Sequence, residues 1–431
     1  MAPTPPPWVS DGLCAAAGQL VAHGWCGRCI GRAFAGYGHG LTNPQRMELL
    51  LPPQVRTWLP AEADCPLCLG ILIDIARLAR LVVEASAPYE FQTLAVGALL
   101  DRSPEDAQGM ALAPLGDVAK PEPLRREFNR EVGKGALALL PGKTADVKMP
   151  DLVVQVDPLF LRTRVQVRST YFAGRYRKLV RDIPQTHWPC RSCRGHGCDE
   201  CEGTGVRYAI SVEGLVAPTL IEACGGSGAR FHGMGREDID VRMLGRGRPF
   251  VIEVLEPTRR TIDVPSMESR INDLATGRVE VLQLRVAARE LVSAYKDEGA
   301  QKSYHLTVVT DTPLIGASLE ALRTLVPSLQ GITLEQRTPR RVSHRRADLV
   351  RQRRVVMLRI DTPADSWERG SQFEMTLRAQ SGTYIKEFIS GDGGRTVPSV
   401  SSHLGVPARA EALDVIAVHD KDEDTPQGAE G

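Results

Sequence analysis

Eight of the ten cysteines in this chain are arranged as four Cys-x-x-Cys pairs. In a reducing compartment such pairs indicate metal thiolates rather than disulfides. Two facing pairs supply the four ligands of a closed tetrahedral zinc site, which leaves no open position for a substrate. We therefore expect two structural zinc sites. The paired ligands are Cys26 and Cys29 with Cys65 and Cys68, and Cys190 and Cys193 with Cys198 and Cys201.

A second group of residues combines carboxylates with glycines and arginines. Asp238 and Asp240 lie in the Gly- and Arg-rich residues 231–248, directly before an apolar run at 249–255. One interpretation is a salt-bridged turn, because neighbouring arginines commonly hold such acids in place. The other is a reactive carboxylate in a fixed position. Composition alone does not separate the two.

Positive charge is concentrated in two runs, although the 53 Lys and Arg residues nearly cancel the 52 Asp and Glu residues of the whole chain. Residues 162–207 contain ten basic residues against four acids, and residues 337–354 contain eight arginines against Asp348 alone. One such run can be a solvated surface. Two runs dominated by arginine favour contact with a phosphate backbone. We predict two cationic loops that contact a phosphate backbone.

Length and composition exclude several classes of protein. The chain has 431 residues, of which 42% are hydrophobic and 24% are charged, so it is neither disordered throughout nor fibrous and has room for two to four domains. Its start lacks the basic and apolar regions of a signal peptide. The most apolar stretch, residues 69–87, has the spacing of an amphipathic helix rather than a membrane span. We expect a cytoplasmic protein without a membrane partner.

The surrounding pattern predicts an α+β protein whose main sheet is mixed and largely antiparallel, with flanking helices. We expect a zinc-binding module at residues 1–70, an α/β domain at 71–167, a larger domain at 168–418 and an acidic tail at 419–431. A helix is predicted at 318–329. Strands are predicted at 151–157, 207–212, 249–255, 278–287, 304–310, 354–361, 372–380 and 412–418.

Two short motifs resemble those of pseudouridine synthases. Gly235-Arg-Glu-Asp238 is similar to the Gly-Arg-x-Asp motif that carries their catalytic aspartate, and Gly382-Thr-Tyr384-Ile-Lys386 is similar to their Gly-Thr-Tyr-Ile-Arg motif. The resemblance to one family covers nearly the whole chain. It is the archaeal tRNA pseudouridine synthase with an N-terminal THUMP domain, the tenth family. The similar segments are residues 174–186, 190–201, 235–250, 336–348 and 382–396.

This resemblance implies an isomerase that converts uridine to pseudouridine in the T-loop of tRNA, chiefly at position 55 and often also at position 54. Asp238 would attack the ribose and break the C1'–N1 bond, after which the uracil rotates and rejoins through C5. The reaction is redox-neutral, so it needs no catalytic cofactor, and zinc would be structural only. The region 71–167 would be the THUMP domain that selects tRNA.

The resemblance also implies roles for residues near the aspartate. Tyr384 would stack on the flipped base. Lys386 would pair with the aspartate and keep it ionised, although the wider superfamily often has arginine there. Arg236, which lies beside Asp238 in the sequence, is placed to fill the vacated position in the RNA or to hold a phosphate. Tyr304 matches a second active-site tyrosine, although strand-borne tyrosines usually pack in a sheet, and Leu413 is the candidate for packing beneath the aspartate.

Other interpretations remain open at this point. THUMP-containing thiouridylases and methyltransferases also act on tRNA, but the chain lacks their phosphate loop and methyl-donor motif. A zinc-dependent tRNA-binding or chaperone-like protein would leave Asp238 with a structural role only. No heptad or exposed apolar stripe stands out, so we expect a monomer.

Overall fold

The computed structural model describes residues 6–297 and 299–420. The chain divides into two compact units. One comprises Met1–Arg168 with Glu256–Thr261, and the other comprises Ser169–Leu255 with Ile262–Gly431. The predicted zinc-binding module and the predicted α/β domain at 71–167 therefore lie within the same unit. Among the described residues, no helix is long and apolar enough to cross a membrane.

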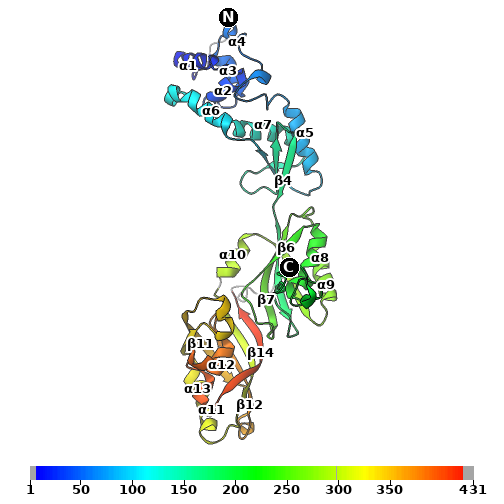
Figure 1. Cartoon of the computed structure of the whole chain (residues 1–431), viewed down its shortest axis with the longest axis vertical. Helices are drawn as coiled ribbons and strands as arrows, with labels where there is room; N and C mark the ends of the chain where they lie inside the picture. Colours follow the sequence, from blue (N-terminus) through cyan, green and yellow to red (C-terminus); the bar gives the residue numbers. More distant parts are fainter. Residues whose placement is uncertain (1–5, 298, 421–431) are drawn as a thin grey trace, which may run out of the picture. The chain divides into compact units, whose positions relative to one another are not determined.

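In the first unit a four-stranded sheet, in the order β2-β1-β3-β4, packs against helices α5 (Ile75–Ser86) and α7 (Leu124–Ala138) (Figure 1). Alternate residues of β3, namely Leu152, Val154 and Val156, are fully buried, as expected for a strand with one covered face. The strands are β1 (Thr93–Ala98), β2 (Thr144–Ala145), β3 (Leu152–Asp157) and β4 (Arg162–Val167).

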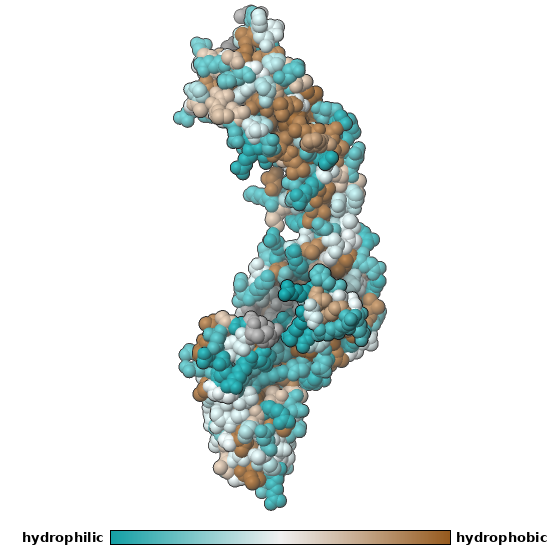
Figure 2. Space-filling view, viewed as in Figure 1, coloured by the Kyte–Doolittle hydropathy of each residue, from teal (hydrophilic) through white to brown (hydrophobic). Residues whose placement is uncertain are grey.

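A single hydrophobic core joins this sheet to the N-terminal helices, from Leu13 to Val156. In Figure 2 hydrophobic side chains gather on the surface of the first unit near α5, and Leu69 and Ile73, just before this helix, are more than half exposed. The helices are α1 (Asp11–Val21), α2 (Gly27–Ala33), α3 (Asn43–Leu50), α4 (Pro53–Arg56), α5 (Ile75–Ser86), α6 (Ser103–Leu112) and α7 (Leu124–Ala138), with 3-10 turns η1 (Glu62–Asp64) and η2 (Ala113–Val118).

The second unit is built on a ten-stranded sheet in the order β13-β10-β11-β12-β9-β14-β7-β5-β8, with β6 paired to β7. Among the described strands of this sheet, β14 and β7 are parallel and the other pairs are antiparallel. The strands are β5 (Thr170–Lys178), β6 (Gly228–Gly233), β7 (Arg242–Leu255), β8 (Val279–Ala287), β9 (Gln301–Thr310), β10 (Thr333–Arg337), β11 (Val350–Ile360), β12 (Gln372–Ala379), β13 (Thr396–Val397) and β14 (Ala408–His419).

Helices cover both halves of this sheet. Helices α8 and α9 lie side by side near β7 and β8, whereas α11, α12 and α13 pack near β11 and β14 (Figure 1). The helices are α8 (Val212–Cys224), α9 (Val264–Leu274), α10 (Glu290–Asp297), α11 (Gly316–Leu329), α12 (Ile385–Ser390) and α13 (Val400–Leu404), and the 3-10 turns are η3 (Asp199–Cys201), η4 (Arg340–Arg345), η5 (Ala364–Ser366) and η6 (Gly391–Gly394).

The α+β fold with a largely antiparallel sheet is confirmed, but two local predictions are wrong. Residues 207–212 are not a strand, because Ser211 instead caps α8 by accepting a hydrogen bond from the Gly214 amide. The predicted tail begins too early: His419 belongs to β14, and the buried Asp420 pairs with Arg175 at 2.7 Å. Residues 421–431 lie outside the described part of the chain.

Candidate active site

The second unit contains a cavity of about 550 Å³. Its lining comes from the segment after β5, from the β6–β7 connection, from η4, from the turn before α12 and the start of that helix, and from β9 and β14. All six second-unit residues that the sequence predicts for catalysis, substrate binding and packing line it. They are Arg236, Asp238, Tyr304, Tyr384, Lys386 and Leu413.

Asp238 is in the β6–β7 connection, with its side chain one-third exposed to the cavity. The Arg341 Nη1 atom lies 2.9 Å from Asp238 Oδ2, and the Lys386 Nζ atom lies 3.8 Å from the same oxygen. Lys386 is closer to Asp240, at 2.6 Å. The carboxylate of Asp238 thus faces two cations, of which arginine is the nearer.

Arg341 reaches the aspartate from η4 and also donates from Nε to Glu387 Oε1 at 2.6 Å. Burial alone would lower the pKa of Arg341, but Glu387 and Asp238 outweigh burial and hold this pKa above its ordinary value. Arg341 belongs to the predicted cationic run at 337–354, and no local pattern in the sequence separates it from the other arginines there.

A buried hydrogen-bond network fixes the loop that carries Asp238. Arg248 Nε lies 2.9 Å from Glu237 Oε2, and both side chains are almost fully buried. The Tyr176 hydroxyl donates to Glu237 at 2.8 Å. Gln185 Nε2 donates to the Tyr176 hydroxyl at 2.8 Å and to the Gly235 carbonyl at 3.0 Å. Because the contacts among Arg248, Glu237, Tyr176 and Gln185 are buried and paired, the network fixes Glu237, the residue directly before the aspartate.

Gly235 begins this loop with a φ of +81°, and a Cβ there would lie 3.0 Å from Arg248 Nη1. Glycine is required at this position for both reasons. Lys178 supports the far side of the loop. Its buried Nζ donates to the carbonyls of Ile183, Asp238 and Ile239 at 2.9, 3.1 and 2.9 Å. Burial lowers the pKa of Lys178.

The prediction that the cationic run at 162–207 forms a loop that contacts a phosphate backbone is therefore wrong in part. Arg162 and Arg164 lie on β4 and Lys178 on β5, so these side chains belong to strands. Lys178 and Arg175 are also buried and engaged within the protein. The run at 337–354 likewise extends into β11. Charge along the sequence does not distinguish a buried cation that pairs within the protein from one that faces solvent.

Tyr384 stands directly before α12 and is held by its backbone. Its amide donates to Gln336 Oε1 at 2.9 Å, and Gln336 Nε2 donates to its carbonyl at 3.0 Å. Its hydroxyl accepts from Arg346 Nη1 at 3.2 Å. Two hydrogen bonds to the fully buried Gln336 of β10 fix the Tyr384 backbone at the cavity wall.

Tyr304 and Leu413 line the cavity from adjacent strands, β9 and β14, and both are 7% exposed. Burial raises the pKa of Tyr304 to about 12, and Arg248 opposes this shift. The phenol is therefore protonated at neutral pH. Arg236 is exposed, and its guanidinium carbon lies 5.0 Å from the centre of the Trp188 ring.

The charge of the cavity wall favours an anionic ligand. Six basic side chains line it against three carboxylates. A lining of this composition is complementary to an anion such as a phosphate group. The basic residues are Arg236, Arg248, Lys302, Arg341, Arg346 and Lys386, and the acids are Glu237, Asp238 and Asp240.

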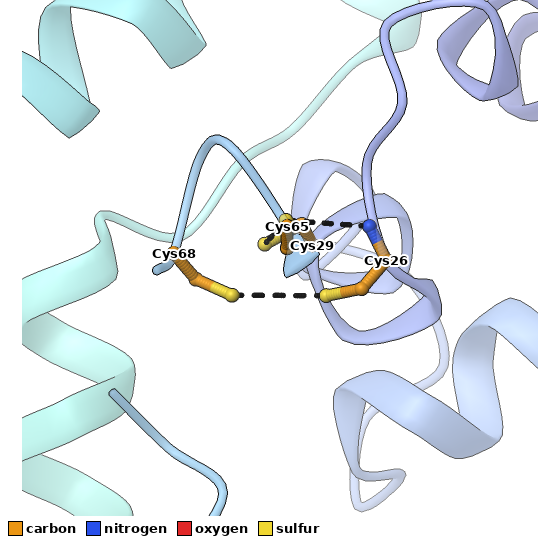
Figure 3. A group of neighbouring side chains, drawn as sticks. All are labelled: Cys26, Cys29, Cys65 and Cys68. Atoms are coloured by element: carbon orange, nitrogen blue, oxygen red, sulfur yellow. Dashed lines mark hydrogen bonds between the residues drawn. The ribbon is translucent and has the colours of Figure 1, made fainter. Parts of the chain in front are cut away.

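The first cysteine cluster has the geometry of a closed metal site. The sulfur atoms of Cys26, Cys29, Cys65 and Cys68 all lie within 4.8 Å of one another. Figure 3 shows Cys26 and Cys68 pointing toward each other, with 3.8 Å between their sulfurs, and Cys29 and Cys65 are 3.6 Å apart. A tetrahedral zinc with bonds of about 2.3 Å separates its sulfurs by about 3.8 Å. The cluster could hold a structural metal.

The second cluster meets the same test. The Cys190–Cys198, Cys193–Cys201 and Cys198–Cys201 sulfur distances are 3.9, 3.8 and 3.7 Å. Backbone amides of Gly197 and Gly205 donate to the sulfurs of Cys193 and Cys201 at 3.1 and 3.2 Å. Such amides stabilise the negative charge of metal-bound thiolates.

Two family models match this chain. The model described as "Pus10, C-terminal" covers residues 171–419, which include the whole cavity, and the model described as "Pus10 THUMP domain, archaeal" covers residues 78–157. The second match falls within the region where the resemblance predicts a THUMP domain. A solved Cbf5-Nop10-Gar1 complex matches 47% of this chain and 45% of its own at 16% identity, with a TM-score of 0.28, too loose a likeness to support an argument.

Curated relatives named "tRNA pseudouridine synthase Pus10" match almost end to end. The relative from Methanothermobacter marburgensis is 42% identical over 91% of this chain and 94% of its own length. The relative from Halorubrum lacusprofundi is 40% identical, with coverage of 92% and 94%, and that from Pyrococcus furiosus is 36% identical, with coverage of 93% and 96%. The chain belongs to the Pus10 family of tRNA pseudouridine synthases.

Proposed function

We propose that this protein isomerises uridine to pseudouridine at position 55 of the tRNA T-loop, with position 54 as a second target. The observation that carries the proposal is the placement of Asp238 in a basic cavity beside Tyr384 and Lys386, directly after Glu237, which a buried network holds. Its family membership supplies the reaction class.

The proposed reaction needs one carboxylate and no redox partner. Asp238 attacks the ribose at C1', and the C1'–N1 bond breaks so that the electron pair leaves with the uracil. The uracil turns and bonds to C1' through C5, which releases Asp238. The proton on C5 is then lost and N1 gains one, so that product and substrate are isomers. Arg341 and Lys386 balance the charge of the carboxylate throughout.

The target base must leave the folded loop before this chemistry can begin. Unstacking costs a few kcal/mol, which stacking and phosphate contacts offset. Tyr384 provides a ring whose backbone is already fixed. The exposed Arg236 and Arg346 at the cavity lining provide cations for the phosphates or for the vacated place in the loop.

We also propose that both cysteine clusters bind zinc with a structural role. Four thiolates at tetrahedral spacing match the ligand preference of Zn²⁺ and leave it no open coordination position. Neither cluster lines the cavity that contains Asp238, so the proposed chemistry passes through no metal.

The test is position-resolved pseudouridine mapping on an unmodified tRNA transcript. Wild type should modify position 55, and signal at position 54 would establish the second target. Asp238→Asn should abolish the signal. Asp240→Asn is the matched control, because Asp240 lies in the same loop and also pairs with Lys386, and this variant should still form product. Tight tRNA binding without product from wild type would instead favour a non-catalytic binding protein.

A further inference from the structure

Two aromatic rings and two arginines form a cluster beside the cavity. Trp188 and Tyr208 meet edge to face with 5.6 Å between ring centres. The Arg236 guanidinium lies 5.0 Å from the centre of the Trp188 ring, and that of Arg207 lies 5.8 Å from Trp188 and 5.3 Å from Tyr208. Trp188 and Arg236 also line the cavity that contains Asp238. We call these four residues the Trp188 cluster.

The loop that carries the second cysteine site positions the residues of this cluster. Trp188 and Arg207 flank the metal-binding loop and are joined by a hydrogen bond from the Arg207 amide to the Trp188 carbonyl at 2.9 Å. The next residues inward, Pro189 and Val206, form an antiparallel bridge. The Cys190 amide then donates to the Gly205 carbonyl at 2.8 Å. Closure of the loop around its sulfurs therefore sets the spacing of the two aromatic rings.

Ordinary core packing does not explain the Trp188 cluster. Trp188 and Tyr208 are only partly buried, and neither is among the described residues of the hydrophobic core of the second unit. Arg207 and Arg236 are exposed. A flat aromatic ring that carries guanidinium groups and opens toward a basic cavity has the chemistry of sites that stack single-stranded bases.

We propose that the Trp188 cluster binds a second nucleobase of the substrate RNA, one that neighbours the uridine in the cavity. This inference rests on the proposed function and extends it. The base stacks on the Trp188 ring, while Arg236 and Arg207 contact the adjoining phosphates. The second cysteine site thus acts as a positioning element for RNA, because it holds Trp188 beside the cavity.

The experiment measures coupling between Trp188 and individual loop nucleotides. Binding is measured by fluorescence anisotropy in the Asp238→Asn background, which prevents turnover, with T-arm hairpins that carry one abasic residue at each loop position in turn. Stacking of one base contributes about 5- to 150-fold in affinity. With Trp188 present, removal of the recognised base should cost this factor. With Trp188→Ala, the same removal should cost little.

Two further variants control the measurement. Trp188→Phe keeps a flat ring and should retain the coupling, whereas Trp188→Leu should lose it, so a general folding defect can be separated from loss of stacking. Trp58→Ala removes a tryptophan that is 81% exposed in the first unit and should leave the coupling unchanged.

If the affinity penalties of Trp188→Ala are equal for every abasic position, the proposal is wrong. Failure of the proposed function gives a different result, because wild type would then form no pseudouridine on the intact hairpin, whatever the coupling shows.

Discussion

The two cysteine clusters have the same ligands but opposite surroundings. In the first, all four cysteines are 1% exposed and belong to the hydrophobic core of their unit, and Cys29 and Cys65 are 36 positions apart in the sequence. In the second, Cys193 and Cys198 are half-buried, and the whole site fits within one loop. The first cluster holds a core together, whereas the second shapes a surface.

The charged groups beside the two clusters also differ in burial. Arg32 is fully buried beside the first cluster, where Nη2 donates to Cys29 Sγ at 3.4 Å and Nη1 pairs with Glu127 at 3.2 Å. Buried thiolates need such a cation, because water does not reach them. Backbone amides donate to sulfurs in both clusters, but beside the second cluster a polar contact, Ser192 to Glu200, is exposed. Identical motifs can therefore contribute very differently to stability.

The largest effect should come from breaking the first cluster. Cys29→Ser should remove the unfolding transition of the first unit, because structural zinc contributes about 10–16 kcal/mol in small zinc domains. Cys193→Ser should leave that transition in place. Calorimetry together with zinc analysis of both variants tests this. Equal loss of the transition in the two variants would contradict the comparison.

The next effect concerns the buried charge. Glu127→Ala leaves Arg32 buried without its carboxylate and should lower the free energy of unfolding of the first unit by about 3–5 kcal/mol. Glu200→Ala beside the second cluster should change the free energy of unfolding by less than about 0.5 kcal/mol. Denaturant titrations measure both. A small effect of Glu127→Ala would mean that the ion pair is not needed in the core.

The two clusters should release their metal at different rates. A chromogenic chelator should take zinc quickly from the half-buried second cluster and slowly from the first, whose release requires opening of the core. Cys193→Ser should lack the fast phase. A single release rate in wild type would show that exposure does not control access. Trp188 fluorescence should change with the fast phase only.

The smallest effect on the stability of the first unit should come from Asp151, whose contribution does not depend on a metal. Asp151 is buried; burial alone raises its pKa, but the amides of Gln92 and Thr93 and the guanidinium groups of Arg260 and Arg168 outweigh burial and lower it. Its ionised form therefore stabilises the fold above the unfolded-state pKa of about 3.9, and this contribution is lost as the pH falls through the lower native pKa.

Asp151→Asn should accordingly destabilise the first unit at neutral pH, and the difference from wild type should shrink in acid. Unfolding curves at a series of pH values measure this difference. A difference that stays constant down to strongly acidic pH would show that the charge of Asp151 does not matter.

The parts of the candidate site that the sequence predicts are those carried by short motifs. Asp238, Tyr384 and Lys386 stand in two local patterns, so they could be named without knowledge of the fold. Arg341 and Gln336 could not, because their partners, Asp238 and Tyr384, are distant in sequence and pairing depends on the sheet. No local pattern encodes such a contact.

The ends of helices also depend on contacts that a local sequence pattern does not encode. The helix predicted at 69–87 begins only at Ile75, because Leu69 and Gly70 have φ values of +52° and +68°, which no right-handed helix contains. Asp74 then caps the helix by accepting from the Arg77 amide. The apolar spacing indicates the helix correctly, but the backbone conformation that ends it depends on the neighbouring cysteine site.

Strand β14 has a consequence for synthesis of the protein. It lies between β9 and β7 and thereby joins the two halves of the large sheet, and Leu413 at the cavity wall belongs to it. On the ribosome this strand emerges after every other strand that the structure describes. Nascent chains that stop short of it have both halves but no completed pocket, so translation must pass β14 before the protein can bind its substrate.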